Sequence, residues 1–286
     1  MGIVFEKDMN IISDKIMVGW LSYVNKDNID RRHDIFETSI ESLINLKDQP
    51  TYIVNFDNNS STEIKDRILN SNIFDKCIHF KDNFLDISVL LGVPYLANKM
   101  GFKYCMYMYD DFTIFNNDFV NDTVSFLNNN EDVHCVRVTE YSYSKMNEYD
   151  SRIIPKNKNP DSIRHYNTVT GNKLSWSDPI HVGKSVFYKN NWHYTSRPTV
   201  WRTDVLLSIF ENIDEIPVMQ PFEGYACKEL QNIPLVTGVL DFGAMNTFKQ
   251  SERMITKKQI GKGKPARSIS SKISKDLFIK LLMELT

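Results

Sequence analysis

The chain has 286 residues, and its 34 Lys and Arg nearly balance its 36 Asp and Glu, so the net charge is −2. This length fits one large α/β domain, or one domain with a substantial insert. No apolar run approaches the roughly 20 residues of a membrane-spanning helix, and the four cysteines lack metal-ligand spacing. The sequence therefore argues against a membrane span and a cysteine zinc site.

The charge is distributed unevenly along the chain. Residues 249–286 hold ten Lys and Arg against three Asp and Glu, a local charge of +7, which leaves −9 for residues 1–248. A basic C-terminal segment on an otherwise acidic chain predicts that this segment binds an anionic partner. The first residues carry acids early and lack the basic-then-apolar order of a secretion signal. With Cys105 and Cys135 in apolar runs, as buried free thiols, we expect a reduced, cytoplasmic protein.

The first half of the chain alternates short apolar strands with amphipathic helices. The predicted strands are 15–24, 51–56, 77–80, 103–109 and 132–141, and the predicted helices between them are about 31–46, 61–70, 86–100 and 116–130. Ser60 and Glu63 predict a capping box, and Pro94 predicts a kink in the third helix. Short, continuously apolar strands joined by helices predict a doubly wound, mostly parallel α/β sheet over residues 1–141.

The periodicity is lost from about 142 to 195. The polar composition of this segment predicts a long functional loop or a small irregular subdomain. Beyond it we expect strand segments within 185–201, helices at 202–213 and 223–232, and a closing strand within 233–244. A flexible basic segment and a last amphipathic helix complete the chain.

Two of the predicted strands end in carboxylates. Strand 51–56 ends at Asp57, and strand 103–109 ends at Asp110 and Asp111. In open parallel sheets ligands bind beyond the carboxyl ends of the strands, so the three carboxylates would gather at one rim. Such like charges are tolerated if a divalent cation or a polar ligand lies between them, and carboxylate oxygens suit Mg²⁺ or Mn²⁺.

Several common ligand classes lack their motifs in this sequence. No GxGxxG follows a strand, no GxxxxGK[ST] occurs, and neither GxSxG nor HExxH is present. We therefore expect no dinucleotide site, P-loop, hydrolase elbow or HExxH zinc site. Without a glycine-rich cradle, a phosphate-bearing ligand would need a metal ion or Lys and Arg.

Three features follow one another in the first 120 residues: an Arg-containing helix (RRHDIFETSIESL), a strand with an Asp-Asn-x-Ser turn (VNFDNNSS), and a small-residue segment (GVPYLANKMGFKY) leading to YMYDDF. In these features this part of the chain resembles the nucleotide-binding half of a GT-A fold glycosyltransferase of the family 2-like, inverting type. The resemblance implies a Rossmann-like sheet with an acceptor-side insert and a C-terminal helical tail. The implied parts are a nucleotide-sugar-binding half at 1–141, an acceptor-binding half at 142–248, and a basic flexible segment with a helix at 249–286.

The resemblance also implies roles for particular residues. Asp57 and Asn58 would contact the nucleoside, and Arg32 would approach the nucleotide from the first helix. Asp110 would face the ribose or the transferred sugar, close to the reacting atoms. Asp111 would hold Mn²⁺ or Mg²⁺ on the diphosphate.

Tyr109 stands where the family motif usually has a further acid. Two registers of the motif are therefore open, and we prefer the one that keeps Asp111 as the metal ligand. The second half of the chain resembles the family only in layout, and PFEGYACKEL falls where many members place a catalytic acid. Glu223 would then deprotonate the acceptor hydroxyl in an inverting displacement.

The basic segment has three interpretations. Lys262, Lys264 and Arg267 would reach the diphosphate if the segment is a mobile lid. The same residues fit a solvated tail, or a contact with a nucleic-acid backbone. Nothing in the sequence separates these three.

Each candidate residue also has a structural interpretation. Asp57 could cap the turn before the next helix, and Asp110 and Asp111 could be helix N-caps. Arginines such as Arg32 are more often surface residues than ligand contacts. Glu223 lies at a predicted helix start, where carboxylates frequently have a structural role. We favour ligand contact for the three aspartates because of their strand-end positions.

We therefore expect an enzyme that transfers a hexose or pentose from a nucleotide-diphosphate sugar, with UDP favoured, to an acceptor hydroxyl. The acceptor would be a glycan, a lipid-linked sugar or a protein, or else a hydroxymethylated DNA base, as in phage-type DNA modification. A nucleotidyltransferase uses similar acids but generally needs an early Gly/Lys-rich loop, which is absent near residue 25. A non-catalytic nucleotide-sugar-binding module is the third hypothesis, suggested by Tyr109.

Overall fold

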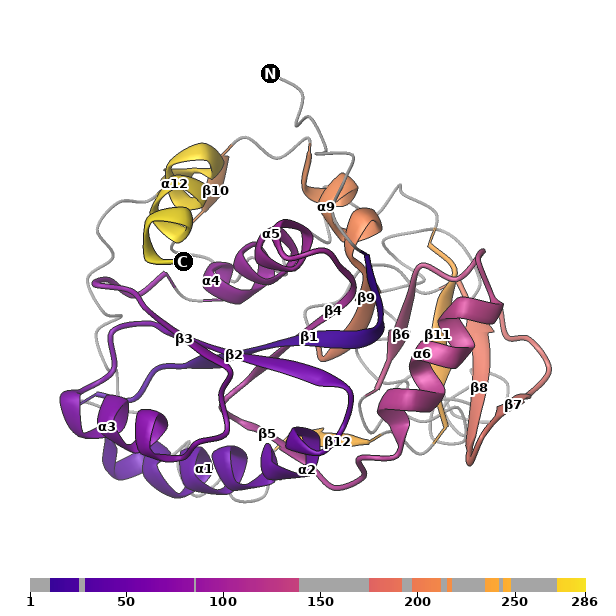
Figure 1. Ribbon diagram of the computed structural model, residues 1–286, viewed down its shortest axis with the longest axis horizontal. Helices are drawn as coiled ribbons and strands as arrows, with labels where there is room; N and C mark the ends of the chain where they lie inside the picture. Colours follow the sequence, from indigo (N-terminus) through magenta and orange to yellow (C-terminus); the bar gives the residue numbers. More distant parts are fainter. Residues whose placement is uncertain are drawn as a thin grey trace, which may run out of the picture.

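The computed structural model describes residues 11–25, 29–84, 86–138, 175–191, 197–211, 215–217, 235–241, 244–247 and 272–286. These residues form one nine-stranded sheet with helices on both faces and two small two-stranded sheets beside it (Figure 1). The order across the large sheet is β3-β2-β1-β4-β9-β6-β11-β8-β7.

The large sheet is mixed but mostly parallel. In spatial order its strands are β3 (Lys76–His79), β2 (Thr51–Asp57), β1 (Ile12–Ser22), β4 (Phe102–Tyr109), β9 (Thr199–Arg202), β6 (Cys135–Arg137), β11 (Thr237–Leu240), β8 (Ser185–Asn190) and β7 (Ile180–Val182). The pairing places seven of the nine strands in one direction and reverses β9 and β8. The first four strands are therefore a purely parallel block, as crossover helices between them require.

Helices cover both faces of this sheet (Figure 1). One layer holds α1 (Ile29–Ser42), α2 (Ile44–Lys47), α3 (Thr62–Asn70) and α6 (Phe119–Asn129), and the other holds α4 (Ile87–Leu90), α5 (Gly92–Lys99), α9 (Thr203–Glu211) and α12 (Lys275–Leu285). The small sheets pair β5 (Phe112–Ile114) with β12 (Met245–Thr247), and β10 (Glu215–Pro217) with β13 (Lys272–Ser274).

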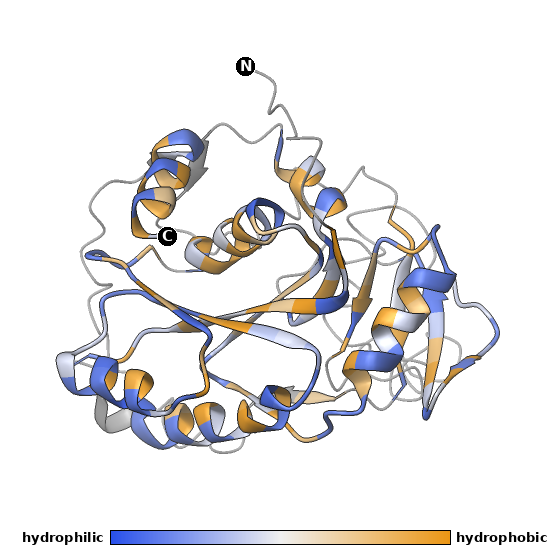
Figure 2. Cartoon of the chain, viewed as in Figure 1, coloured by the Kyte–Doolittle hydropathy of each residue, from blue (hydrophilic) through white to orange (hydrophobic). Residues whose placement is uncertain are grey.

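A separate apolar core fills the space on each side of the sheet. Along β1, Met17 and Leu21 join the core beneath α5, whereas Ile16, Val18 and Trp20 join the core beneath α1. Alternate residues of a strand point to opposite faces, so a strand covered on both faces must be apolar throughout. Figure 2 shows hydrophobic and hydrophilic colours mixed on the surrounding helices, as expected for elements with one buried side.

The structure confirms the predicted fold class, a doubly wound and mostly parallel α/β sheet. The predicted helix at 86–100 is divided into α4 and α5, which meet at Leu91, three residues before Pro94. The predicted capping box is wrong. The N-cap of α3 is Ser61, without a side-chain cap hydrogen bond, and the Ser60 hydroxyl instead accepts from the Val24 N–H at 3.1 Å.

The described end of the polar 142–195 segment is more regular than expected. Strands β7 and β8 pair as a hairpin at the edge of the large sheet, and the turn between them packs on α6. The Lys184 N–H donates to Asp122 Oδ2 at 3.0 Å. At the preceding Gly183, φ is +57° and an added Cβ would lie 2.1 Å from Asp122 Oδ1, so a side chain is excluded there. The predicted closing strand, β11, lies inside the sheet between β6 and β8.

Strands from both predicted halves of the chain share the large sheet. Strand β9 lies between β4 and β6, and β11 pairs with β6. The predicted boundaries at 141 and 248 fall outside the described residues and stay predictions. In the described part of the chain, no helix is both long and apolar enough to cross a membrane.

Candidate functional site

The carboxyl ends of the parallel strands bring a row of polar side chains together. The pairing register sets Ser22, Asp57 and His79, the last residues of β1, β2 and β3, side by side. On the other side of β1, Asp110 follows the end of β4 at the level of Ser22. Because neighbouring strands are about 4.8 Å apart, the Asp57 and Asp110 backbones lie roughly 10 Å apart, within reach of one small ligand.

Asp57 is completely buried within this row. Its Oδ1 accepts a hydrogen bond from Ser22 Oγ at 3.2 Å. The Ser60 N–H donates to both carboxylate oxygens, at 3.2 Å each. Two basic groups also face Oδ2, Lys65 Nζ at 3.8 Å and His79 Nδ1 at 3.5 Å. The capping contact expected as the structural alternative is therefore present, and a ligand contact by Asp57 stays a prediction.

The turn that follows Asp57 is held to the end of β1. Asn58 is fully buried and its N–H donates to Ser22 O at 2.9 Å. Asn59 has a φ of +64°, in the left-handed region that Asn tolerates better than most residues. Below the turn, Asn55 Nδ2 donates to Ser22 Oγ at 2.9 Å. The Asp-Asn-Asn-Ser sequence thus sets a tight, internally bonded turn at the rim.

Asp110 is bound by the first turn of α1. Arg32 Nη2 donates to Asp110 Oδ1 in an ion pair, and the Tyr23 N–H donates to Oδ2 at 3.2 Å. The Asp110 side chain is 6% exposed and the Arg32 side chain 35% exposed, so the guanidinium is the more accessible partner. Burial raises the pKa of Asp110 to about 6, and Asp111 adds to the rise, while Arg32 and the Tyr23 N–H oppose it.

The described carboxylates do not form a metal centre. Both oxygens of Asp110 and both of Asp57 accept from the protein itself, and of the three rim aspartates only Asp111 is partly exposed. Tyr109, where an acid was expected, packs against the apolar cores and the ring of Phe112. Over the described ranges, no group of three or more His, Cys, Asp and Glu could hold a metal ion. A Mn²⁺ or Mg²⁺ ion held by side chains alone therefore does not fit the described residues.

The structure brings five predicted site residues to one rim. They are Arg32, Asp57, Asn58, Asp110 and Asp111. The other four, Glu223, Lys262, Lys264 and Arg267, lie outside the described residues, so their roles stay predictions.

The sequence did not identify Ser22, Lys65 and His79 as rim residues. The predicted strands ended at Val24 and Phe80, whereas β1 ends at Ser22 and β3 at His79. The alignment of Ser22 and His79 with Asp57 becomes visible only with the correct strand ends and register. Lys65 follows Asp57 by eight residues, and this spacing is the one signal that could have indicated it, because the helix after a parallel strand begins near the carboxyl edge where that strand ends.

No protein-family model matches the chain, and no curated protein matches it. Solved structures do match. Residues 1–349 of S. aureus TarS are 12% identical over 95% of this chain and 70% of that one, with a TM-score of 0.44. The same fragment in complex with UDP-GlcNAc is 11% identical over 82% of this chain and 58% of that one, with a TM-score of 0.46.

Two further solved structures are similar at the same level. The mannosyltransferase PcManGT from Pyrobaculum calidifontis, in complex with GDP-Man and Mn²⁺, is 10% identical over 81% of this chain and 57% of that one, with a TM-score of 0.42. A CMP:2-keto-3-deoxy-manno-octonic acid synthetase in complex with CTP is 9% identical over 85% of this chain and 99% of that one, with a TM-score of 0.46. These likenesses concern the fold alone.

Proposed function

We propose that the protein is a glycosyltransferase that uses a nucleotide-diphosphate sugar as donor. The observation that carries the proposal is the alignment of Ser22, Asp57 and Asp110 at the carboxyl ends of adjacent parallel strands, with Arg32 beside them. Ligands of open α/β sheets bind at this edge. The hydrogen-bond acceptors of these side chains, together with the partly exposed guanidinium of Arg32, suit a ligand that carries both hydroxyls and phosphates.

In this proposal the two sides of the rim have different tasks. Arg32, which is partly exposed, contributes positive charge toward the diphosphate. Asp57 acts by ordering residues 58–60, since its own oxygens are occupied by that turn and by Ser22. Asn58 and the turn would then lie against the nucleoside, and Asp110 against the ribose or the transferred sugar.

The chemical step follows from the roles assigned to Glu223 and Arg32. Glu223 accepts the proton of the acceptor hydroxyl as the acceptor oxygen attacks the anomeric carbon, and the nucleoside diphosphate departs with inversion. Positive charge from Arg32 stabilises the departing diphosphate. A divalent ion, when bound, would supply the same charge stabilisation through Asp111. Because the described donors do not fit such an ion, no step of this mechanism depends on one.

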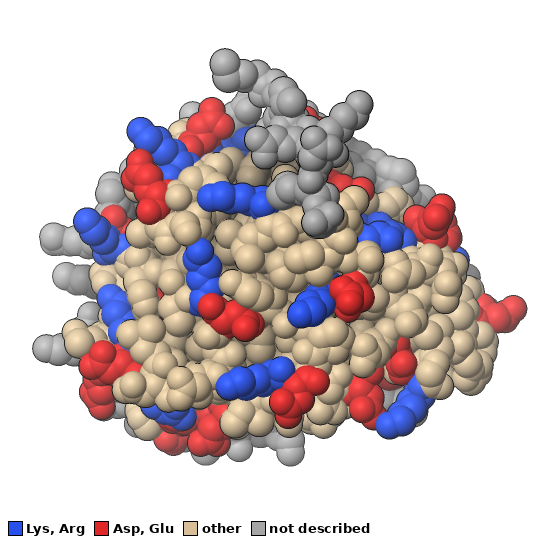
Figure 3. Space-filling view, in the orientation of Figure 1, with Lys and Arg blue, Asp and Glu red and all other residues tan. Residues whose placement is uncertain are grey.

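The donor and acceptor remain matters for experiment. We favour a UDP-sugar as donor and a glycan, lipid-linked sugar or protein hydroxyl as acceptor, with a hydroxymethylated DNA base as the alternative. On the face drawn in Figure 3, basic and acidic side chains are interspersed over the described residues, so this face presents no broad basic surface for DNA. In the DNA alternative, we assign recognition of DNA to the basic segment with Lys262, Lys264 and Arg267.

The proposal is tested by incubating the protein with a panel of labelled nucleotide sugars, with and without acceptors, in EDTA and in Mn²⁺. We expect release of a nucleoside diphosphate and transfer of label to one acceptor class. Asp110→Asn should abolish transfer, whereas Asp66→Asn, an exposed change on α3, should not. Release of pyrophosphate from a nucleoside triphosphate and a sugar would indicate a nucleotidyltransferase instead. Donor binding without turnover would indicate a binding module, and no binding of any donor would refute the proposal.

A further inference from the structure

The buried carboxylates of the rim each have a positive partner from the chain itself. Asp110 is paired with Arg32, and Lys65 Nζ lies 3.8 Å from Asp57 Oδ2. A buried carboxylate is costly unless it is paired and hydrogen-bonded, and here that requirement is already met. This differs from an acidic rim whose charges require a cation for balance.

The Arg32–Asp110 pair has the geometry of a cation bound at the rim. Asp110 Oδ2 is directed to the Tyr23 N–H, which leaves Oδ1 for the guanidinium. Arg32 reaches this oxygen from a partly exposed position in the first turn of α1. The guanidinium thus occupies the Asp110 oxygen that a metal ion would approach, and the Nη donors that Asp110 does not use can serve an anion at the same time.

We propose that Arg32 takes the place of a divalent cation at Asp110. The protein then binds neither Mn²⁺ nor Mg²⁺ at this carboxylate, and an anionic ligand at the rim is met by the guanidinium. The first statement depends only on the ion pair. The second rests on the proposed function, because it assumes that the ligand carries a diphosphate.

A purely structural brace is the competing explanation of the pair. Such a brace would fasten α1 to the end of β4, and its removal would lower stability without any effect on metal affinity. If Arg32 instead takes the place of a cation, removing it should raise the affinity for a metal ion. The Asp110 carboxylate, left without its positive partner, would then attract another cation. Affinity for a metal ion therefore separates the two explanations where stability does not.

The experiment measures Mn²⁺ binding by electron paramagnetic resonance of the free ion, without any nucleotide. The native protein and Arg32→Lys, which keeps the charge, should bind Mn²⁺ no better than Asp110→Asn. Arg32→Gln should bind one Mn²⁺ at least about tenfold more tightly, and adding Asp110→Asn should remove that gain. The matched control is Arg67→Gln, which removes another guanidinium that is paired with α1, through Glu37, but away from the rim.

The possible results decide the proposal. It is overturned if the native protein binds Mn²⁺ as tightly as Arg32→Gln, or if the gain in Arg32→Gln survives the loss of Asp110. Should Arg32→Gln fail to fold, the comparison of the native protein with Asp110→Asn can still refute the proposal. If the native protein binds Mn²⁺ tightly and Asp110→Asn abolishes this binding, Arg32 does not take the place of the cation.

A second measurement addresses the anionic ligand and uses UDP as the probe. By titration calorimetry, the native protein should bind UDP with affinities in EDTA and in Mn²⁺ that agree within about twofold. UDP affinity should fall in Arg32→Gln and be unchanged in Arg67→Gln. Binding of UDP only in Mn²⁺ would overturn the second statement, that the guanidinium meets the anionic ligand. If UDP and other nucleotides bind under neither condition, the proposed function fails, while the Mn²⁺ result still decides the role of Arg32.

Discussion

The Asp57 carboxylate is fully buried, and its surroundings come from two strands, a turn and a helix. Ser22 ends β1, His79 ends β3, Ser60 precedes α3 and Lys65 belongs to that helix. One side chain therefore fixes the relative positions of the loops at the carboxyl edge. Any ligand held by the 58–60 turn depends on this order, because the turn has no apolar core of its own to define it.

Removing the Asp57 carboxylate should destabilise the protein strongly. In Asp57→Ala the partners Ser22 and Ser60 lose their acceptor inside the protein, and the free energy of unfolding should fall by about 2–4 kcal/mol. Urea denaturation followed by circular dichroism measures the change. Asp66→Ala, at an exposed position on α3, should change it by less than about 0.5 kcal/mol. Equal effects of the two substitutions would show that Asp57 is not a structural anchor.

The two buried cysteines should be chemically inert in the folded protein. Cys105 and Cys135 are 0% and 2% exposed, and burial raises the pKa of each thiol to about 12. The thiolate is the reactive form, so at pH 8 both groups stay protonated as well as inaccessible. Mass spectrometry after iodoacetamide treatment at pH 8 should find neither residue modified until urea unfolds the chain. Modification of either one in the native protein would contradict the described core.

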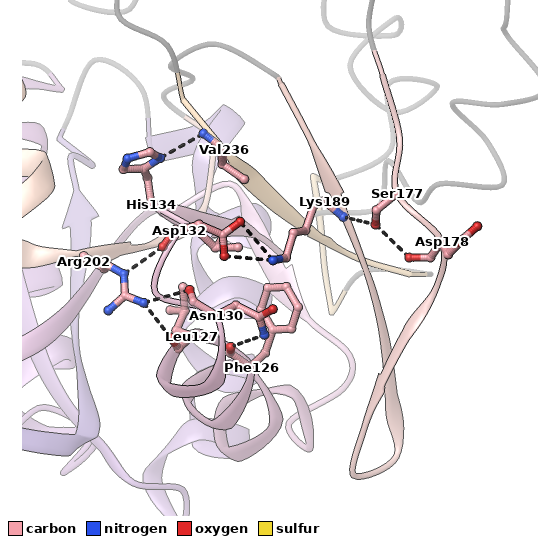
Figure 4. Close-up of polar contacts among 11 residues, drawn as sticks. Phe126, Leu127, Asn130, Asp132, His134, Ser177, Asp178, Lys189, Arg202 and Val236 are labelled. Carbon is pink, nitrogen blue, oxygen red and sulfur yellow. Dashed lines mark hydrogen bonds and ion pairs between the residues drawn. The ribbon is translucent and has the colours of Figure 1, made fainter.

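Helix α6 depends on a residue from a distant strand for its C-terminal end. Arg202, the last residue of β9, donates through Nε to Val133 O at 2.8 Å and through Nη2 to Asn130 O at 3.0 Å and to Leu127 O (Figure 4). The last carbonyls of a helix have no partner within it, and a cation at this end also complements the helix dipole. The guanidinium thereby joins α6, the following loop and the centre of the sheet.

Substitution at Arg202 should show that the shape of the guanidinium matters, not only its charge. Arg202→Met removes three hydrogen bonds to carbonyl groups, and the free energy of unfolding should fall by about 2–4 kcal/mol. Arg202→Lys keeps the charge but cannot reach three acceptors, so it should recover less than half of the loss. Both values come from urea denaturation. Full recovery by Lys would mean that the helix dipole alone explains the contact.

The purely parallel block of the sheet could be predicted from the sequence, and the strand order in the mixed remainder could not. Strands β1, β2, β3 and β4 are short apolar runs separated by helices, which is a local signal. Strand β9, in contrast, inserts between β4 and β6 although it follows β6 by more than 60 residues. Its place depends on packing between distant segments, which no local periodicity records.

The candidate site divides in the same way. Asp57, Asp110 and Asp111 are recognisable because acids at the ends of apolar strands are unusual. Their partners are less visible, since the contact of Arg32 with Asp110 depends on how α1 crosses the edge of the sheet. The internal balance of charge at the rim, and with it the poor fit to a metal ion, could therefore be found only in three dimensions.

The continuous sheet predicts that both predicted halves of the chain unfold together. Strand β9 joins them, because Trp201 pairs with Cys105 of β4 on one side and with Cys135 of β6 on the other, and its side chain is fully buried. A two-domain protein with a separate acceptor half would instead open at such a junction. Hydrogen exchange can distinguish these behaviours, since it reports the free energy of opening for each strand.

We expect the amides of β1, β4 and β9 to exchange only by global unfolding, and those of β6 and β11 to match them within about 1 kcal/mol. The edge strand β7 should exchange by local opening, because it pairs with β8 alone and is partly exposed. Exchange by mass spectrometry over increasing urea measures both quantities. If β6 and β11 open several kcal/mol more easily than β4, the second half is an independent unit. The ligand rim would then belong to the first half alone, and acceptor specificity to a part that can move relative to it.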